Sequence, residues 1–484
     1  MKNVILIITD TYRYDNLGTR AERPVHTPEL DRFLAEQATE IHRCYTGSFP
    51  TIPHRTDVAR GVLGWPHHGW QPIHSSGPNH IAELFREGGY VSQLICDCPH
   101  LFNAGFQMGF DAAYQIRGQE GDKPLLHMND PIESAMPFEK TRQHPVWHGH
   151  PLVDSHRWAN RYPLYEGDMF PARTGSTAVR WLEENSESGP FFLWVDFFDP
   201  HEPWDPPEYM VRRYDRGYDR PAMMHPNYGS SSVFTEAELR NLWAHYAAEA
   251  ELVDRWIGRI LQKIDDLELW EDSIVVVTSD HGMSIGEHGR TGKSNISDPD
   301  DRFWPIYPEI GHVPFLIAGG DVPHAQSLDL IAQPIDIVPT VAELAGLSLQ
   351  PTHPLDGRSF ANAILAGDNR HREFAVTGCF AQPAAESGSV PREACTPFVV
   401  TQEWGYAPIG PDGAPELYDI RRDPLACENL IVDNLEVAEG LQALLREHLL
   451  VHGASKDTAD LWRPLESGNG DRGVWAVDYP KDGV

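Results

Sequence analysis

The sequence has few cysteines, few basic residues and no long apolar run. Only six of its 484 residues are cysteine, too few for a disulfide framework in a chain of this length. Cys96 and Cys98 are too close together for an ordinary bridge, and a second pair that would complete a zinc site with them is lacking. This usage is typical of reduced thiols, and we therefore expect a cytoplasmic protein.

The shortage of positive charge excludes two classes of partner. The chain has 39 lysines and arginines against 71 aspartates and glutamates, which gives a formal net charge of −32. Such a chain repels nucleic acid and anionic membrane surfaces. The apolar run at residues 4–8 is too short for a signal peptide, and no segment approaches the roughly 18 apolar residues of a membrane span. We expect no nucleic-acid or membrane partner, and the sequence leaves open a homo-oligomer.

The residues that are present favour a large α/β domain. Hydrophobic residues make up 41% of the chain, which is enough for a sizeable core. Short apolar runs predict strands at residues 4–8, 90–96, 191–197, 273–278 and 313–318. Helical patterns alternate with these runs, at residues 27–39, 80–87, 175–185, 237–264 and 336–345. This alternation predicts a doubly wound, mainly parallel sheet.

The composition changes twice along the chain. Residues 115–170 are rich in proline, histidine and tryptophan without periodicity, which predicts a loop or insertion. From residue 373 onward the pattern changes to short strands, at 374–377 and 398–401, with one late helix at 435–450. We therefore predict a main domain over residues 1–372 and a smaller α+β subdomain with a tail over residues 373–484.

Acidic and imidazole side chains follow three of the predicted strands. Asp10 follows the first strand, and Asp280 and His281 follow the strand at 273–278. Asp199 and His201 follow the strand at 191–197. Because ligands bind at the carboxyl ends of strands in such sheets, we expect these side chains to converge. Asp10, Asp280 and His281 suit a divalent cation such as zinc, manganese or calcium.

A threonine precedes a short helical pattern that ends at Gly61. Thr51 stands where a helix cap would lie, Pro53 suits the first turn, and Arg55 lies one turn further on. One interpretation is a plain helix cap. The other is a nucleophilic hydroxyl at a helix N-terminus, where backbone N–H groups favour an anion. In that case Arg55 would hold an anionic oxygen beside Thr51.

Five sequence blocks, in the right order, resemble the sulfatase family of the alkaline phosphatase superfamily. Thr51-x-Pro53-x-Arg55 resembles the signature in which a cysteine or serine becomes formylglycine. Residues 279–293 resemble the second signature, whose catalytic lysine corresponds to Lys293. The other blocks lie at residues 200–204, 336–359 and 416–430. The resemblance covers nearly the whole chain. It implies a sulfatase-like catalytic domain over residues 1–372 and hydrolysis of an ester bond in a small anionic substrate.

The resemblance also implies roles for individual residues. The implied metal ligands are Asp10, Thr51, Asp280 and His281. The implied catalytic residues are Thr51, Arg55, His201 and Lys293. The weaker matches, which imply substrate contacts, are Thr11, His100 and His288.

Several departures from the sulfatase pattern bear on the chemistry. Thr51 cannot become formylglycine, because that maturation starts from cysteine or serine. Thr11 stands where sulfatases have a second aspartate, and His281 where calcium sulfatases have asparagine. The lysine that usually precedes His100 is missing, and an acidic, aromatic stretch at residues 294–309 follows Lys293. We expect that stretch to be a specificity loop.

The departures at Thr51, Thr11 and His281 resemble the phosphoryl-transferring relatives of sulfatases, which favour zinc or manganese. We therefore expect a hydrolase of phosphate or phosphonate esters with Thr51 as nucleophile. It would use one divalent metal, zinc or manganese in preference to calcium, and no formylglycine. His201, His288 or a second metal held by Asp199 and His201 would activate the water. The alternatives are a sulfuric ester hydrolase with unmodified Thr51 and a catalytically silent sulfatase-like binding protein.

Overall fold

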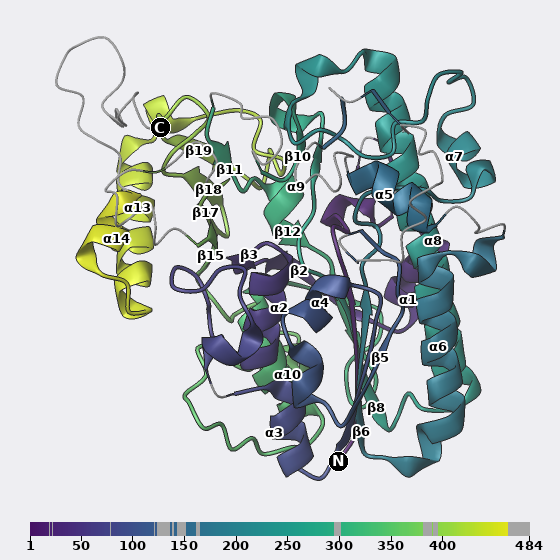
Figure 1. The fold of residues 1–484 in the computed structure, drawn as a ribbon. Coiled ribbons are helices and arrows are strands. Elements are labelled where there is room, and N and C mark those ends of the chain that lie inside the picture. The colour runs from purple at the N-terminus through teal and green to yellow at the C-terminus, as the bar shows by residue number, and fades with distance from the viewer. Residues whose placement is uncertain are drawn as a thin grey trace.

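A nine-stranded sheet runs through the centre of the molecule, and helices cover both of its faces (Figure 1). The computed structural model describes residues 1–18, 20–21, 23–77, 79–120, 122, 136–137, 140–142, 152–160, 165–294, 302–380, 390 and 395–462. The predicted tail after residue 462 and most of residues 121–151 therefore lie outside the described residues.

The order of the central sheet explains how distant segments meet at one edge. Its neighbouring strands are, in order, β12 (His312–Val313), β2 (Thr39–Tyr45), β13 (Phe315–Ala318), β8 (Ser273–Ser279), β1 (Asn3–Thr9), β6 (Phe191–Phe197), β4 (Val91–Cys96) and β5 (Ala112–Gln115). A ninth strand, β14 (Gln326–Ala332), pairs with β2. The pairs β1–β6, β1–β8, β4–β6, β4–β5 and β14–β2 are parallel, whereas β12 and β13 run antiparallel to their neighbours. The sheet is therefore mainly parallel, as the sequence predicts.

Strand β1 is buried on both faces, which is why its sequence is continuously apolar. Leu6 and Ile8 pack into one core, and Ile5 and Ile7 pack into the core on the opposite face. The first core contains side chains from α2 (Thr51–Arg60), α3 (Ile81–Glu87) and α10 (Ile337–Leu344). The second contains side chains from α1 (Pro28–Glu36), α6 (Phe170–Asn185) and α8 (Glu236–Asp266). This arrangement confirms the doubly wound α/β class.

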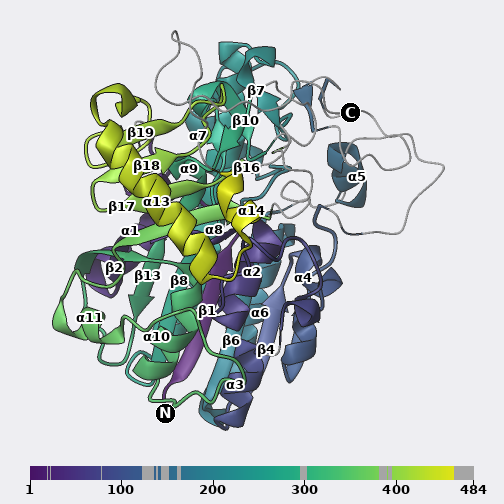
Figure 2. The same ribbon diagram turned by 90° about the vertical axis from the view of Figure 1, so that its left-hand side faces the viewer.

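A second, five-stranded sheet is formed largely by the C-terminal part of the chain (Figure 2). Its order is β19 (Glu416–Asp419), β18 (Trp404–Ala407), β17 (Phe398–Thr401), β15 (Phe374–Cys379) and β3 (Ser48–Phe49). Helices α13 (Leu435–Val451) and α14 (Lys456–Leu461) contribute to the core beside it. Because β3 belongs to the N-terminal part, this sheet crosses the predicted boundary at residue 373.

The remaining helices and strands are shorter. They are α4 (Pro99–Asn103), α5 (Leu152–Ala159), α7 (Glu208–Tyr214), α9 (Pro308–Gly311), α11 (Ala361–Ala366), β7 (Gly229–Ser230), β9 (Ser284–Ile285), β10 (Arg290–Gly292), β11 (Trp304–Pro305) and β16 (Cys395–Thr396).

Three predicted boundaries differ from the structure. The helix expected at residues 27–39 ends at Glu36, and Thr39 already begins β2. The strand expected at 313–318 is divided into β12 and β13 at Pro314. The described part of the stretch expected to be a loop at 115–170 contains helix α5, and α6 begins at Phe170, five residues before the predicted start. Strands β2 and β14 were not expected from the sequence.

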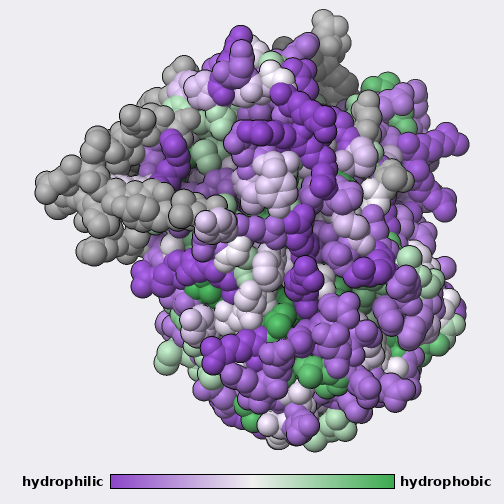
Figure 3. Space-filling view, turned by 90° about the vertical axis from the view of Figure 1, so that its right-hand side faces the viewer, coloured by the Kyte–Doolittle hydropathy of each residue, from purple (hydrophilic) through white to green (hydrophobic). Residues whose placement is uncertain are grey.

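Hydrophilic residues cover most of the face drawn in Figure 3, with scattered apolar side chains between them. Within the described part of the chain, no helix combines the length and the apolar character that crossing a membrane requires.

Candidate active site

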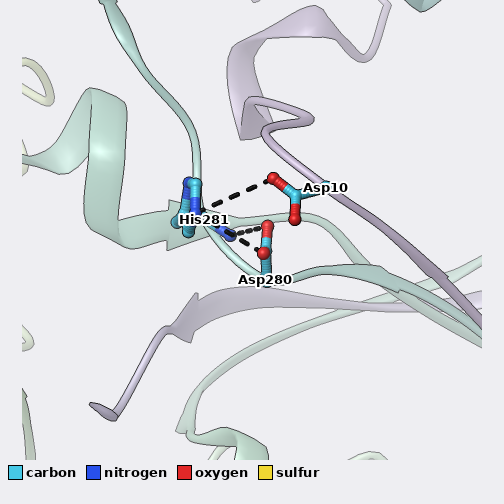
Figure 4. Close-up of side chains that lie close together, drawn as sticks. All are labelled: Asp10, Asp280 and His281. Atoms are coloured by element: carbon cyan, nitrogen blue, oxygen red, sulfur yellow. Dashed lines mark hydrogen bonds and ion pairs between the residues drawn. The ribbon is translucent and has the colours of Figure 1, made fainter. Parts of the chain in front are cut away.

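Two neighbouring strands bring a group of buried metal-ligating side chains together. Asp10 follows β1, and Asp280 and His281 follow β8, which pairs with β1 in parallel. All three side chains are fully buried, and one ligand atom from each lies within 4.8 Å of the others (Figure 4). Among the described residues, this is the one group of three or more such side chains. The sequence predicted this set from the ends of the strands.

The imidazole of His281 is oriented as a metal ligand. Its Nδ1 donates to the carbonyl oxygen of Gly282 at 2.9 Å. Its Nε2 has no hydrogen-bond partner among the described residues and lies 3.8 Å from Asp10 Oδ1 and 3.4 Å from Asp280 Oδ2. Burial, together with the Lys293 cation, holds the pKa of His281 well below its ordinary value. A neutral ring with a free nitrogen facing two carboxylates fits a bound divalent cation.

The pKa values of the two carboxylates in this group, Asp10 and Asp280, are shifted in opposite directions by their surroundings. Burial raises the pKa of Asp10, but the cations of Lys293 and Arg55 outweigh it and hold that pKa well below the ordinary value. Burial and the adjacent Asp10 charge raise the pKa of Asp280 well above its ordinary value. A cation between them would favour the ionised form of both. The donor set therefore fits a divalent metal.

Arg55 binds carboxylates of the site. Its guanidinium contacts Asp196 through Nε and Nη2, each at 3.0 Å, and contacts Asp10 at 3.1 Å. It also contacts Asp280, and its side chain is completely buried. Asp196 lies within β6 and was missed by the sequence reasoning. A single acidic residue inside an otherwise apolar buried strand was the signal that could have revealed it, because such a charge needs a partner.

Thr51 is the first residue of α2 and is 2% exposed. Two residues before it, the Phe49 ring lies 5.0 Å from the ring of His281. One helical turn after it, Arg55 contacts Asp10 and Asp280. Thr51 thus lies at the N-terminal end of α2, as the sequence predicts, between two residues that contact the metal-ligating group. It is not the helix cap that one interpretation of the sequence expected, because Pro50 occupies the cap position.

Thr11 links the metal-ligating group to Lys293. Its φ of 63° lies in the left-handed region, which a β-branched residue rarely adopts. In this conformation its N–H donates to Asp280 Oδ1 at 3.0 Å and its hydroxyl donates to Asp10 Oδ1 at 2.8 Å. Lys293 Nζ donates to the same hydroxyl at 3.3 Å and lies 3.8 Å from Asp10. Strain of this kind is typical of functional sites.

His201 is buried on the loop after β6, beside these residues. Its Nδ1 donates to the carbonyl oxygen of Glu202 at 2.6 Å, and its ring stacks on Phe198 with centroids 4.2 Å apart. Burial lowers the pKa of His201, so the ring is neutral and its Nε2 carries a lone pair. Asp199, the expected partner in a second metal site, accepts instead from Gln119 at 2.8 Å.

His100 and His288 lie in different surroundings. Nε2 of His100 lies 3.8 Å from Glu120 Oε2, and its ring packs edge-on to Trp70 at 5.0 Å. His288 Nδ1 pairs with Glu309 at 2.9 Å. Its Nε2 contacts the carbonyl oxygen of Ala426 at 3.0 Å. Both nitrogens of His288 are thus occupied, which argues against its expected contact with substrate or water.

The described part of the stretch expected to be a specificity loop is buried. Phe303 and Trp304 are each 1% exposed, and the Arg290 guanidinium lies 4.5 Å from the Trp304 ring centroid. Trp304 also pairs with Cys395 through β11 and β16. Residues 295–301 lie outside the described residues. Phe303 and Trp304 are thus packed inside the protein, which does not fit an exposed specificity loop.

Comparisons with known proteins show the family to which the chain is similar. Residues 2–347 match the family model described as Sulfatase. The arylsulfatase of Clostridium perfringens is 24% identical over 464 residues, covering 89% of this chain and 90% of the relative. The multifunctional alkaline phosphatase superfamily protein PehA of Trinickia caryophylli is 24% identical over 490 residues. This similarity covers 89% of this chain and 91% of PehA.

Solved structures of similar fold include two phosphonate monoester hydrolases. That of Agrobacterium radiobacter superposes with a TM-score of 0.68 at 22% identity, covering 93% of this chain and 95% of its own. That of Silicibacter pomeroyi has a TM-score of 0.67 at 19% identity, covering 94% of this chain and 96% of its own.

The family match spans more than half of the sequence and includes both strands that deliver the metal-ligating group. The chain therefore belongs to the sulfatase family, within the alkaline phosphatase superfamily, and is an ester hydrolase.

Proposed function

We propose that this chain hydrolyses phosphate or phosphonate esters with Thr51 as its nucleophile and one divalent metal bound by Asp10, Asp280 and His281. The observation that carries the proposal is the threonine itself. It cannot be converted to formylglycine, yet it heads a helix whose next turn holds Arg55 against two of these ligands. A threonine hydroxyl can form a phosphate ester and release it to water, whereas it lacks the second hydroxyl by which a formylglycine hydrate expels sulfate.

Zinc or manganese, the metals that this proposal favours, would act as a Lewis acid toward the transferred group. Thr51 Oγ attacks phosphorus while the bond from phosphorus to the leaving oxygen breaks. The Thr51 proton passes to His201 Nε2, which is unprotonated because Nδ1 holds the ring proton against Glu202. Lys293, which contacts Thr11 and Asp10, gives a proton to the leaving oxygen.

Water then cleaves the Thr51 ester and restores both groups. The water oxygen bonds to phosphorus as the bond to Thr51 Oγ breaks. The neutral Lys293 amine takes a proton from that water, and protonated His201 returns its proton to Thr51. Arg55 stays bound to its carboxylates and fixes their orientation throughout the cycle.

The test is a comparison of four substrate classes with protein of measured metal content. Aryl sulfate, a phosphate monoester, a phosphate diester and a phosphonate monoester are assayed with wild-type protein, Thr51→Ala and Thr51→Ser. We expect the phosphorus esters to be turned over fastest and Thr51→Ala to lower kcat by about 10³-fold or more, with Thr51→Ser retaining activity.

Three outcomes of the same assay would contradict the proposal. Sulfate turnover that exceeds the phosphorus esters by orders of magnitude would establish the alternative, a sulfuric ester hydrolase with unmodified Thr51, which the arylsulfatase relative favours. Full activity of Thr51→Ala would remove Thr51 as nucleophile. Absence of both activity and bound metal would identify a catalytically silent binding protein.

A further inference from the structure

A cavity of about 760 Å³ lies outside the group of residues assigned to catalysis. Its walls come from the loop after β1, from β2, from α8, from the residues after β9, from α9 and from the segment that follows β19. The described residues that line it include none of the proposed metal ligands or catalytic residues. Its volume falls in the range of about 300–1,000 Å³ that small-molecule sites occupy.

Arginines are concentrated around this cavity. Five of them line it: Arg13, Arg20, Arg23, Arg43 and Arg421. The carboxylates in the lining are fewer, namely Asp15, Glu287 and Glu309. The whole chain carries a formal net charge of −32, so organic anions are repelled from most of its surface. A local excess of guanidinium groups in such a chain marks a place where an anion is attracted.

Four of these arginines keep donors for a ligand, whereas the guanidinium of Arg13 is bound by Asp15, Glu287 and the carbonyl oxygen of Met283. The carboxylates paired with Arg20, Arg43 and Arg421 do not line the cavity; they are Glu40, Asp329 and Glu403. A guanidinium has five N–H donors, and one such pair uses only some of them. Arg23 lies 5.2 Å from the Trp243 ring centroid and has no ion pair within the described part of the chain. The cation of Arg23 is therefore the one most available to an incoming anion.

The remaining wall is apolar or aromatic. Ile420, Pro424 and Leu425, from the C-terminal part of the chain, line the cavity together with Tyr14 and Trp243. Such a wall binds a hydrocarbon or ring body, while the guanidinium groups bind carboxylate or phosphate oxygens in their planar geometry. A lone inorganic ion would leave most of this volume unfilled.

We propose that this cavity is a second binding site, for an organic anion that carries a carboxylate or phosphate on an apolar body. The site shares a loop with the catalytic residues. Asn16 and Arg13 line the cavity, and both bond to the hydroxyl of Tyr246, which itself donates to the carbonyl oxygen of Thr11 at 2.9 Å. A bound anion therefore contacts the segment that positions Asp10 and Thr11.

The test uses anilinonaphthalene sulfonate, a fluorescent organic anion with an apolar ring body, as the probe on the full chain. We expect the wild-type protein to bind one probe molecule per chain. In the double variant Arg23→Gln/Arg421→Gln, the dissociation constant of the probe should be at least tenfold higher than in the wild type. Ala21→Trp, which fills the cavity without changing its charge, should weaken binding as strongly. Benzoate and phenyl phosphate, added as competitors, distinguish a carboxylate site from a phosphate site by which of them displaces the probe at lower concentration.

Matched controls separate this site from the catalytic one. Arg370→Gln removes an exposed arginine that pairs with Asp368 and does not line the cavity, and it should leave the dissociation constant unchanged. Thr51→Ala and treatment with a chelator should also leave it unchanged. The proposal is overturned if both cavity variants bind the probe as the wild type does. Loss of binding in Thr51→Ala or after chelation would overturn it too, because the probe would then occupy the catalytic site.

Discussion

In the candidate active site, the buried cation of Arg55 stabilises the ionised forms of the buried carboxylates around it. The guanidinium of Arg55 contacts carboxylates from three neighbouring strands, namely Asp10 after β1, Asp196 within β6 and Asp280 after β8. Each of these carboxylates is fully buried and would be costly to ionise alone. Arg55 therefore holds the strand ends in place for whichever ion binds there.

Replacement of Arg55 by methionine should destabilise the fold strongly. The substitution leaves Asp10, Asp196 and Asp280 facing one another without their cation, and broken buried ion pairs cost about 3–5 kcal/mol. The free energy of unfolding in urea measures this loss. Arg180→Met, which removes an exposed arginine paired with Glu184, is the control and should leave the free energy of unfolding nearly unchanged, because exposed ion pairs contribute little. Equal effects of the two substitutions would contradict the structural role of Arg55.

The sequence revealed residues whose position follows from a strand end or a motif, and missed residues whose role depends on a partner far along the chain. Asp10, Asp280 and His281 could be predicted because parallel strands end at one edge. Asp196 could not be assigned to Arg55, since 141 residues separate them. The partners of His288, namely Glu309 and Ala426, were missed for the same reason, because they are also remote in sequence.

At the scale of elements, sequence patterns are least informative for a buried strand whose side chains are polar. Strand β2 reads as polar, yet it is buried because the carboxylate of Glu40 pairs with Arg20 and Arg43 pairs with Asp329. Without knowledge of those partners, the helical pattern before it was extended to residue 39. The predicted bounds of the strongly apolar strands β1, β6 and β8 agree with the structure within about two residues. Their continuous apolar sequences match their burial on both faces.

The pair of His288 with Glu309 should make stability depend on pH. Burial opposes the charge on His288, but Glu309 and the Ala426 carbonyl raise its pKa to about 9. Because this lies above the unfolded value near 6.5, the stabilisation is complete below about pH 6.5 and is lost as the pH rises through 9. The contribution is about 3 kcal/mol.

Unfolding free energies measured from pH 6 to 10 test this dependence. His288→Asn, which tolerates the positive φ of 53° at this position, should flatten the profile over that window. His26→Gln, which alters a half-exposed histidine, should leave the slope unchanged. A slope that survives in His288→Asn would assign the titration to other groups.

The pairing of β3 with β15 should make activity sensitive to a substitution in the second sheet. A Cβ added at Gly378 would lie 2.2 Å from the ring of Trp65, so the backbone must shift. Gly378 pairs with Ser48, three residues before Thr51. We expect Gly378→Ala to cost about 1–3 kcal/mol and to lower kcat through displacement of β3.

A matched glycine in the same part of the chain serves as control. Gly440 lies in α13, and a Cβ there would meet nothing within 4 Å. Gly440→Ala should stabilise the protein by about 0.4–1 kcal/mol and leave kcat unchanged. Thermal unfolding and steady-state kinetics of both variants give the comparison, and an active, stable Gly378→Ala would disprove the coupling.

At the scale of the whole molecule, bound metal should raise stability. A ligand that binds only the folded state at about 1,000 times its dissociation constant contributes about 4 kcal/mol. Protein treated with a chelator should therefore melt at a lower temperature, and zinc or manganese should restore the melting temperature. In the variant Asp10→Asn/His281→Gln, neither treatment should have an effect. A melting temperature that does not respond to chelator in protein shown to lose metal would refute the assigned ligands.

The two-residue strand β3 also sets an order of events during synthesis. Ser48 leaves the ribosome about 330 residues before its partner Gly378. At roughly 5–20 residues per second, the segment leading to Thr51 waits roughly 15–70 s for that partner. The nascent chain can thus complete its central sheet from β1 to β8 before the segment that leads to Thr51 has its partner strand. Hydrolytic activity should appear only on nearly finished chains, so that truncated translation products fold in part without becoming active enzyme.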